Sequence, residues 1–213
     1  MESTQLKSVG LGVAAGVGAA ASVLLGRKVA RTVKTSSGHP LKHRALDLAT
    51  GVMQPKYPLD AMSTYLNGFH MYADDMNRQV EASHFCIHLR HDLHQCVIFD
   101  RNAADARLIG IEYIITEERF RDLVTTYGKT FHTWQYDRDD FPYGIPQLMM
   151  GLTGDGQADE GIIRERDRRI GNSTAQKRKS RAEIPTPEVA EGANSWESGQ
   201  TVQTRLQHMN FKR

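Results

Sequence analysis

Apolar and polar side chains alternate along residues 81–99, and this period of two restricts the fold more than any other feature of the chain. Alternation over this length is typical of β-strands, in which successive side chains point to opposite faces of a sheet. If residues 90–92 form the loop of a hairpin, the two halves of the run lie side by side with a defined register. This register pairs Cys86 with Cys96 and His88 with His94.

Other segments of the body favour a mixture of helices and strands. The helical spacing of Met62, Tyr65 and Phe69 predicts a helix over residues 61–72. Apolar or β-branched runs predict three further strands, and a short apolar stripe predicts one more helix. These segments are the strands 107–116, 130–136 and 147–153 and the helix 117–126. We therefore expect an α+β fold with a mainly antiparallel sheet and helices packed on one face.

Composition divides the chain into three parts. We expect an apolar and basic leader over residues 1–38, which forms an N-terminal apolar helix. The α+β domain is expected over 39–170. Residues 171–213 show no continuing apolar period and include prolines, so we expect an extended or disordered tail.

The leader has the character of a segment that contacts lipid. Residues 9–26 contain no charged side chain, which places them at the short end of a membrane-spanning helix. Small residues recur at every fourth position in this run, and on a helix they form a stripe that allows self-association. The basic residues expected at a lipid surface are Arg27, Lys28, Arg31 and Lys34. A cleaved mitochondrial targeting peptide and a flexible leader are the alternative interpretations.

Charge is distributed unevenly along the chain. Residues 1–44 carry seven Lys or Arg and one acidic residue, whereas residues 45–156 carry nine basic and sixteen acidic residues. An acidic body lacks the clustered cations that phosphate contacts require, which argues against nucleic acid as a partner. A basic leader beside an apolar run favours a membrane or lipid surface instead.

The histidines of the hairpin raise the question of a metal site. His84, His88 and His94 share one face of the predicted sheet and are the metal-ligand candidates, with the two cysteines beside them and His70 or His132 as further ligands. The spacing matches no compact zinc motif, so packing and hydrogen bonding beneath a helix is the competing interpretation. We expect the cysteines to remain thiols in a reducing compartment. A nucleophilic Cys/His pair lacks any identifiable third group, so no catalytic residue and no cofactor is assigned.

Several blocks of sequence occur in the order found in a known family. They are FHMYADDMNRQVEASHFCIHL, QCVIFD, ARLIGIEYIITEERF, YGKTFHTWQYDR and GIPQLMM. In these blocks the chain resembles the oil-body-associated proteins, a family built on a domain of unknown function. The resemblance implies association with lipid droplets and no established catalytic activity.

The chain departs from the family pattern in three places. It has Ser83–His84 where the family has paired histidines, and His94 where the family often has arginine. A longer family segment, which includes a His-x-His strand, is absent between Thr116 and the TYGKT block. Such a loss is expected to leave an exposed sheet edge, and it reflects either a genuine short form or a faulty gene model.

These features together predict a non-catalytic protein with a structural or stabilising role at a lipid surface. It is expected at lipid droplets or on a membrane, facing the cytosol, with a mitochondrial location as the alternative. The alternative function is that of a small-ligand- or metal-binding enzyme that uses the histidine-rich face of the sheet.

Overall fold

The computed structural model describes residues 38–115, 129–142, 144–185 and 194–210, together with eight positions between residues 22 and 33. The chain divides into two compact units. The first, here called the N-terminal unit, comprises residues 1–59 with 103–105. The second, the barrel unit, comprises residues 60–102 and 106–213.

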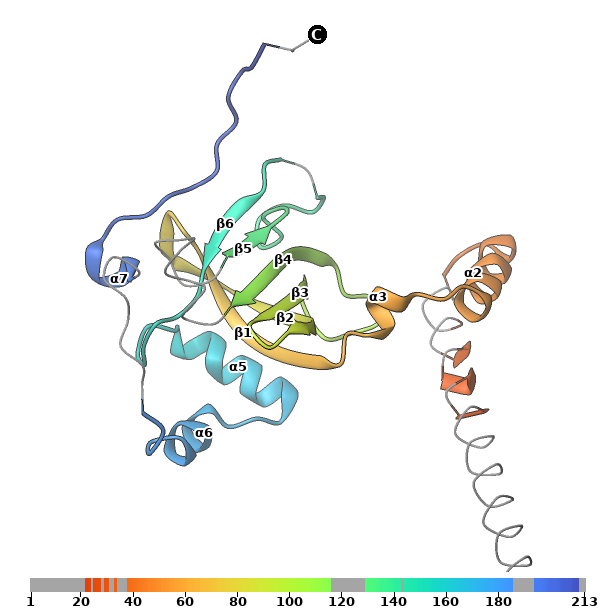
Figure 1. Cartoon of the computed structure of the whole chain (residues 1–213), viewed down its shortest axis with the longest axis horizontal. Helices are drawn as coiled ribbons and strands as arrows, with labels where there is room; N and C mark the ends of the chain where they lie inside the picture. The colour runs from red at the N-terminus through yellow and green to blue at the C-terminus, as the bar shows by residue number, and fades with distance from the viewer. Residues whose placement is uncertain are drawn as a thin grey trace, which may run out of the picture. The chain divides into compact units, whose positions relative to one another are not determined.

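In the described part of the barrel unit, six antiparallel strands form a closed barrel (Figure 1). In chain order the strands are β1 (Thr64–Tyr72), β2 (Asp75–Arg90), β3 (Leu93–Phe99), β4 (Leu108–Ile115), β5 (Lys129–His132) and β6 (Gln147–Met150). Each strand pairs with the next along the chain, and β1 also pairs with β6 through Met71–Met150 and Tyr72–Met149. These two pairs close the sheet, so the exposed edge expected from the sequence is not found in this barrel.

The predicted α+β class, with helices packed on one face of an open sheet, is therefore wrong. Its main error lies at residues 61–72, where a helix was expected and β1 is found. Residues 64–71 pair with residues 79–86 of β2, so their backbone groups are satisfied by a ladder rather than by a helix. Consecutive residues from Phe69 to Tyr72 are all buried, which hides the alternation that would have marked a strand.

The predicted hairpin register is confirmed. Cys86 pairs with Cys96 and His88 pairs with His94 across β2 and β3. Arg90 pairs with Leu93 after a register shift, so the loop is one residue shorter than expected.

The cysteines of this hairpin are not free thiols, and the expectation that they remain reduced is wrong. Cys86 and Cys96 form a disulfide. The register explains the bond, because it holds the two Cα atoms 4.1 Å apart with both side chains on the same face.

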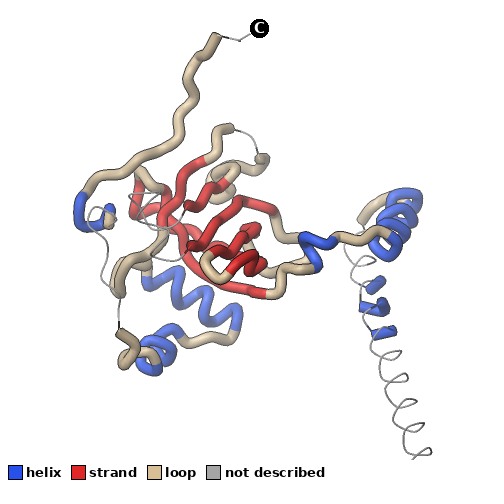
Figure 2. Tube along the Cα trace, viewed as in Figure 1, coloured by secondary structure: helices blue, strands red, loops and turns tan. Residues whose placement is uncertain are grey.

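Among the described residues after the last strand, the barrel unit has the helices α5 (Glu160–Ile170), α6 (Thr174–Ser180) and α7 (Ser195–Ser198). The Asp159 carboxylate caps α5 by accepting hydrogen bonds from the first-turn amides, and Gly171 ends the helix with φ 65°. Phe69 on β1 packs with Ala158 and Ile163, which places α5 along the outside of the barrel (Figure 2).

The N-terminal unit contains helix α2 (Leu41–Met53), none of whose residues is buried. The single helical turn α3 (Tyr57–Asp60) follows it in the chain. The apolar helix and the small-residue stripe predicted in the leader fall largely on residues 1–21, which lie outside the described residues. The helix predicted over residues 117–126 also lies outside them.

The barrel core is apolar at one end. Ala82, Ile98, Ile109 and Trp134 form one buried cluster, and Tyr72, Val80 and Met149 form a neighbouring one that shares contacts with Tyr136. The polar ends of the two large aromatic side chains are satisfied: the Trp134 indole donates to the Leu108 carbonyl at 2.9 Å, and the Tyr136 hydroxyl donates to the Glu81 carbonyl at 2.6 Å.

Candidate functional site

A cluster of polar side chains occupies the barrel interior. Its members, here called the histidine cluster, are His70 on β1, His84 on β2, Glu112 on β4 and His132 on β5. The contacts join strands that are not neighbours in the sheet, such as β2 with β4, and this is possible only across the inside of the barrel. The alternation of strand side chains thus brings together residues that are up to 62 positions apart.

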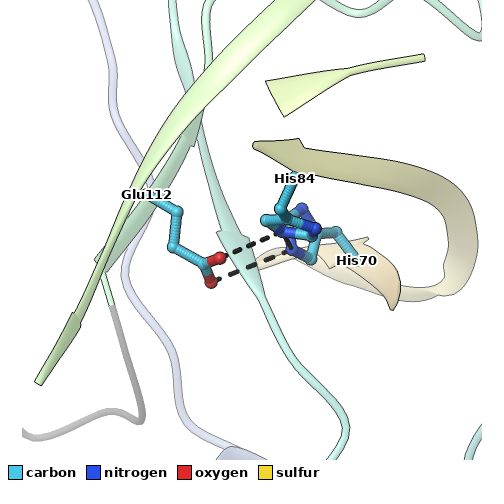
Figure 3. Close-up of side chains that lie close together, drawn as sticks. All are labelled: His70, His84 and Glu112. Atoms are coloured by element: carbon cyan, nitrogen blue, oxygen red, sulfur yellow. Dashed lines mark hydrogen bonds and ion pairs between the residues drawn. The ribbon is translucent and has the colours of Figure 1, made fainter. Parts of the chain in front are cut away.

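Short contacts link the members of the cluster, and Figure 3 shows three of them, His70, His84 and Glu112. His70 Nδ1 lies 3.0 Å from His132 Nε2, and His70 Nε2 lies 3.0 Å from His84 Nε2. His84 Nε2 is also 2.9 Å from Glu112 Oε2, and His70 Nε2 is 3.9 Å from Glu112 Oε1. The hydroxyl of Thr130 donates to Glu112 Oε1 at 2.7 Å.

Gly110 allows the strands to approach closely beside His132. A Cβ atom at this position would lie 2.3 Å from the carbonyl oxygen of Phe131 and 3.1 Å from the His132 ring. Across the sheet, His84 pairs with Ile98, Ile98 pairs with Gly110, and Gly110 pairs with His132. Gly110 therefore lies in the row of residues that connects two members of the histidine cluster. Glycine is therefore required here for packing space rather than for a turn.

The surroundings fix the charges of the cluster. Burial lowers the pKa of His70 to about 4, with a further contribution from His84 and opposition from Glu112. Burial likewise lowers the pKa of His132 to about 2. Burial by itself raises the pKa of Glu112, but the hydrogen bond from His84 and the nearby rings outweigh it and lower this pKa to about 2. At neutral pH the Glu112 side chain is therefore an anion, and the His70 and His132 rings are neutral.

Two ring nitrogens of the cluster have no hydrogen-bond partner within the described part of the chain. They are Nδ1 of His84 and Nδ1 of His132, both buried. Buried polar atoms of this kind are uncommon in folded proteins and require an explanation, such as a bound ion or a functional role. The arrangement of two imidazole nitrogens and a carboxylate suits the binding of a transition metal or the sharing of a proton.

The structure separates the three metal-ligand candidates predicted from the hairpin. His84 lies in the cluster, together with His70 and His132, which were considered as additional ligands. His88 and His94 instead stack against each other, with ring centroids 4.1 Å apart, and His88 is exposed. The hypothesis of a cysteine nucleophile is excluded in this structure because both sulfur atoms are in the disulfide.

Sequence reasoning missed Glu112. The sequence contained a signal for this residue, because Glu112 is the single charged residue inside the apolar run IGIEYII. A carboxylate in such a strand must either be exposed to water or have a buried partner. Its partners come from β1, β2 and β5, and their proximity follows from barrel closure, which the sequence analysis did not predict.

Arg78 on β2 is a basic side chain that lies outside the histidine cluster. In the structure it binds Asp137 through two nitrogens, at 2.7 and 2.9 Å, and lies over the ring of Tyr72. Tyr72 also donates a hydrogen bond to Asp137, at 2.5 Å. Arg78 therefore has a structural partner, Asp137, inside the protein.

A separate groove lies outside the barrel, between β1 and the helices α5 and α6. Apolar side chains such as Leu66 and Ile184 line it together with Lys177 and Arg181. None of the histidines lines this groove.

Of the four basic residues predicted at a lipid surface, Arg27 is described and exposed. Lys28, Arg31 and Lys34 lie outside the described residues. Within the part of the chain that the structure covers, no helix has the length and apolar character needed to span a bilayer.

Comparison with known proteins supports the family resemblance seen in the sequence. The family model described as "Protein of unknown function (DUF1264)" matches residues 56–125 and 119–185. The chain belongs to this family. The two matched ranges overlap at 119–125, in the stretch where the family's longer segment was expected to be absent. The absence of that segment remains a prediction.

The relatives carry names that refer to oil bodies. Oil body-associated protein 1A of Zea mays is 37% identical over 204 residues, which cover 78% of this chain and 86% of that protein. Oil body-associated protein 1B of Arabidopsis thaliana is 34% identical over 205 residues, 78% of this chain and 85% of that protein. Oil body-associated protein 2A of Zea mays is 32% identical over 184 residues, 68% and 73% of the two chains. No solved structure matches the chain.

Proposed function

We propose that this protein associates with the surface of lipid droplets through its N-terminal unit and has a structural, non-catalytic role there. Its family membership and the names of its relatives support a lipid surface as the partner. Those names give no support to the mitochondrial location considered above.

The observation that carries the proposal is the exposure of apolar side chains in the N-terminal unit. None of its described residues is buried. Its large exposed apolar side chains are Val23, Leu25, Val33, Leu41, Leu46, Val52, Met53, Tyr57 and Leu59. Such a concentration without a core of its own is typical of a surface that contacts lipid or another apolar partner.

Helix α2 has the pattern of an interfacial helix. Leu41, Ala45, Leu48 and Val52 follow one another at the spacing that places side chains on one helix face. Polar residues such as His43 and Asp47 occupy the opposite face. An amphipathic helix of this type lies flat at a lipid surface, with its apolar side chains among the acyl chains and its polar face in water.

The basic residues that precede α2 add an electrostatic contribution. Arg27, Lys28, Arg31 and Lys34 follow the uncharged run 9–26 in the sequence. Each cation close to an anionic surface contributes about 1 kcal/mol to binding. In this proposal burial of apolar surface and attraction to head groups act together, while the acidic body of the chain remains in the cytosol.

Imaging in cells loaded with neutral lipid tests the proposal. The full chain is compared with a variant that lacks residues 1–38 and with the double variant Leu41→Asn/Val52→Asn, each fused to a fluorescent protein. We expect the full chain to form rings around droplets and both variants to shift to the cytosol. The matched control, His43→Asn/Asp47→Asn, changes the polar face of α2 and is expected to remain on droplets.

The result that would contradict the proposal is equal droplet coating by the full chain, by the variant that lacks residues 1–38 and by Leu41→Asn/Val52→Asn. The mass of the N-terminus of the protein recovered from these cells separates the remaining alternative, since a cleaved targeting peptide would remove the leader.

A further inference from the structure

We propose that His70, His84 and Glu112 bind one divalent transition-metal ion inside the barrel, and that His132 orients His70 from behind. The proposal is independent of the lipid-associated role and assigns the barrel unit a ligand of its own.

The spacing of the three ligand atoms fits a single ion. His70 Nε2 and His84 Nε2 are 3.0 Å apart, His84 Nε2 and Glu112 Oε2 are 2.9 Å apart, and His70 Nε2 and Glu112 Oε1 are 3.9 Å apart. Two ligands that each lie about 2.1 Å from a tetrahedral ion are about 3.4 Å from each other. The two distances to Glu112 end at its two different oxygens, and one ligand atom from each of the three residues lies within 4.8 Å of the others. Small side-chain movements would therefore bring one atom of each residue to a single ion.

Charge also favours a cation at this point. The described residues give Glu112 ion pairs only with His70 and His84, and none with a lysine or arginine. A buried carboxylate needs a compensating positive charge. A divalent ion between the carboxylate and the two rings would supply this charge.

The donor set indicates which metals fit. Two imidazoles and one carboxylate suit zinc and iron(II), as well as cobalt(II) and nickel(II), whereas calcium and magnesium prefer sites made entirely of oxygen ligands. Three protein ligands leave at least one coordination position open. The side chain of Glu112 retains 16% exposure, against 6% and 5% for the two histidines, so the carboxylate side is the route by which an ion or a further ligand would enter.

His132 has the position of a supporting residue. Its Nε2 atom is 3.0 Å from His70 Nδ1, which is the ring nitrogen that faces away from the proposed ion. A hydrogen bond at this nitrogen fixes the orientation and tautomer of a metal-binding histidine.

The test is a titration of the full-length, tag-free chain with cobalt(II) and zinc after chelator treatment. We expect one ion per chain by elemental analysis and visible absorption bands from cobalt in a low-symmetry nitrogen and oxygen site. Glu112→Gln and His84→Asn are expected to abolish stoichiometric binding. His132→Asn is expected to weaken it by about 10- to 100-fold, which is the usual effect of removing a supporting hydrogen bond.

The matched control is His88→Asn/His94→Asn, which removes two histidines of the same hairpin that lie outside the cluster and should leave binding unchanged. The proposal is overturned if the wild-type chain takes up no stoichiometric ion, or if the control variant loses binding as the His84 variant does. Circular dichroism of each variant identifies those that fail to fold. The wild-type chain itself shows whether an ion is bound, even where a variant does not fold.

Discussion

Replacement of Arg166 by methionine is expected to loosen the attachment of α5 to the barrel. The Arg166 side chain is buried and donates three hydrogen bonds: to Asn67 Oδ1 at 2.7 Å, to Thr174 Oγ1 at 2.8 Å and to Asp167 Oδ1 at 2.8 Å. Its guanidinium carbon also lies 4.8 Å from the centre of the Phe69 ring. This single side chain therefore connects α5 to β1 and to the start of α6.

The expected loss of stability is about 3–5 kcal/mol, the range seen when one partner of a buried ion pair is removed. Three hydrogen bonds from a charged group at about 1.5–3 kcal/mol each would give a larger total. Two compensations lower it. Methionine keeps an apolar contact with Phe69, and Asp167 keeps its hydrogen bonds from Thr174 and Asn172.

Urea unfolding followed by tryptophan fluorescence measures this loss, because Trp134 is buried in the barrel core. The control is Arg164→Met, which makes the same chemical change at an exposed position of the same helix. It should alter stability by no more than about 0.5 kcal/mol. If the two variants differed by less than about 1 kcal/mol, the role assigned to Arg166 would be refuted.

Three further predictions concern the barrel and its helices. Gly110→Ala should lower the free energy of unfolding by more than about 2 kcal/mol, because the new Cβ would lie 2.3 Å from the Phe131 carbonyl oxygen. Gly151→Ala, at a position with open space, should lower it by less than about 1 kcal/mol. Similar urea midpoints for the two variants would contradict this prediction. Replacement of both Cys86 and Cys96 by serine should lower the free energy of unfolding by about 3 kcal/mol, because it removes the cross-link from a loop with a sequence separation of 10. An unchanged urea midpoint would contradict this prediction. Burial raises the pKa of Asp167, but hydrogen bonds led by the one from the Thr174 amide outweigh this effect and lower the pKa from 3.8 to about 2. The stabilisation of the folded state by the Asp167 carboxylate is therefore present above pH 4 and is lost as the pH falls towards 2. At pH 6 the wild type should be more stable than Asp167→Asn by about 1–2 kcal/mol, after allowance for partial exposure of the carboxylate. This difference should shrink between pH 4 and pH 2. A difference that stays constant with pH would refute the role assigned to Asp167.

Local patterns predicted the parts of the fold that local interactions determine. The β2–β3 hairpin was correctly placed because its alternation and its register depend on residues less than 20 positions apart. Strand β4 was found within one residue at each end for the same reason. Strand β1 was missed because its last four residues are buried on both faces, by the barrel interior and by packing on the outside.

Closure of the barrel could not be predicted from local patterns. It depends on two residue pairs between β1 and β6, of which Met71–Met150 joins positions far apart in the chain. The histidine cluster depends on the same closure, because its members come from four strands. Individual histidines were identified as candidates, but their actual partners are set by the barrel and not by their spacing in the sequence.

The most direct test of the lipid-surface proposal is flotation of the purified chain with phospholipid-coated triolein droplets. The account predicts that the wild-type protein rises with the droplets. It also predicts that Leu41→Asn/Val52→Asn weakens binding by about 10- to 100-fold, a loss of about 1.4–2.8 kcal/mol in binding free energy for the two substitutions together. The polar-face control His43→Asn/Asp47→Asn should rise like the wild type. A wild-type chain that stays in the aqueous layer, or an apolar-face variant that rises equally well, would contradict the account.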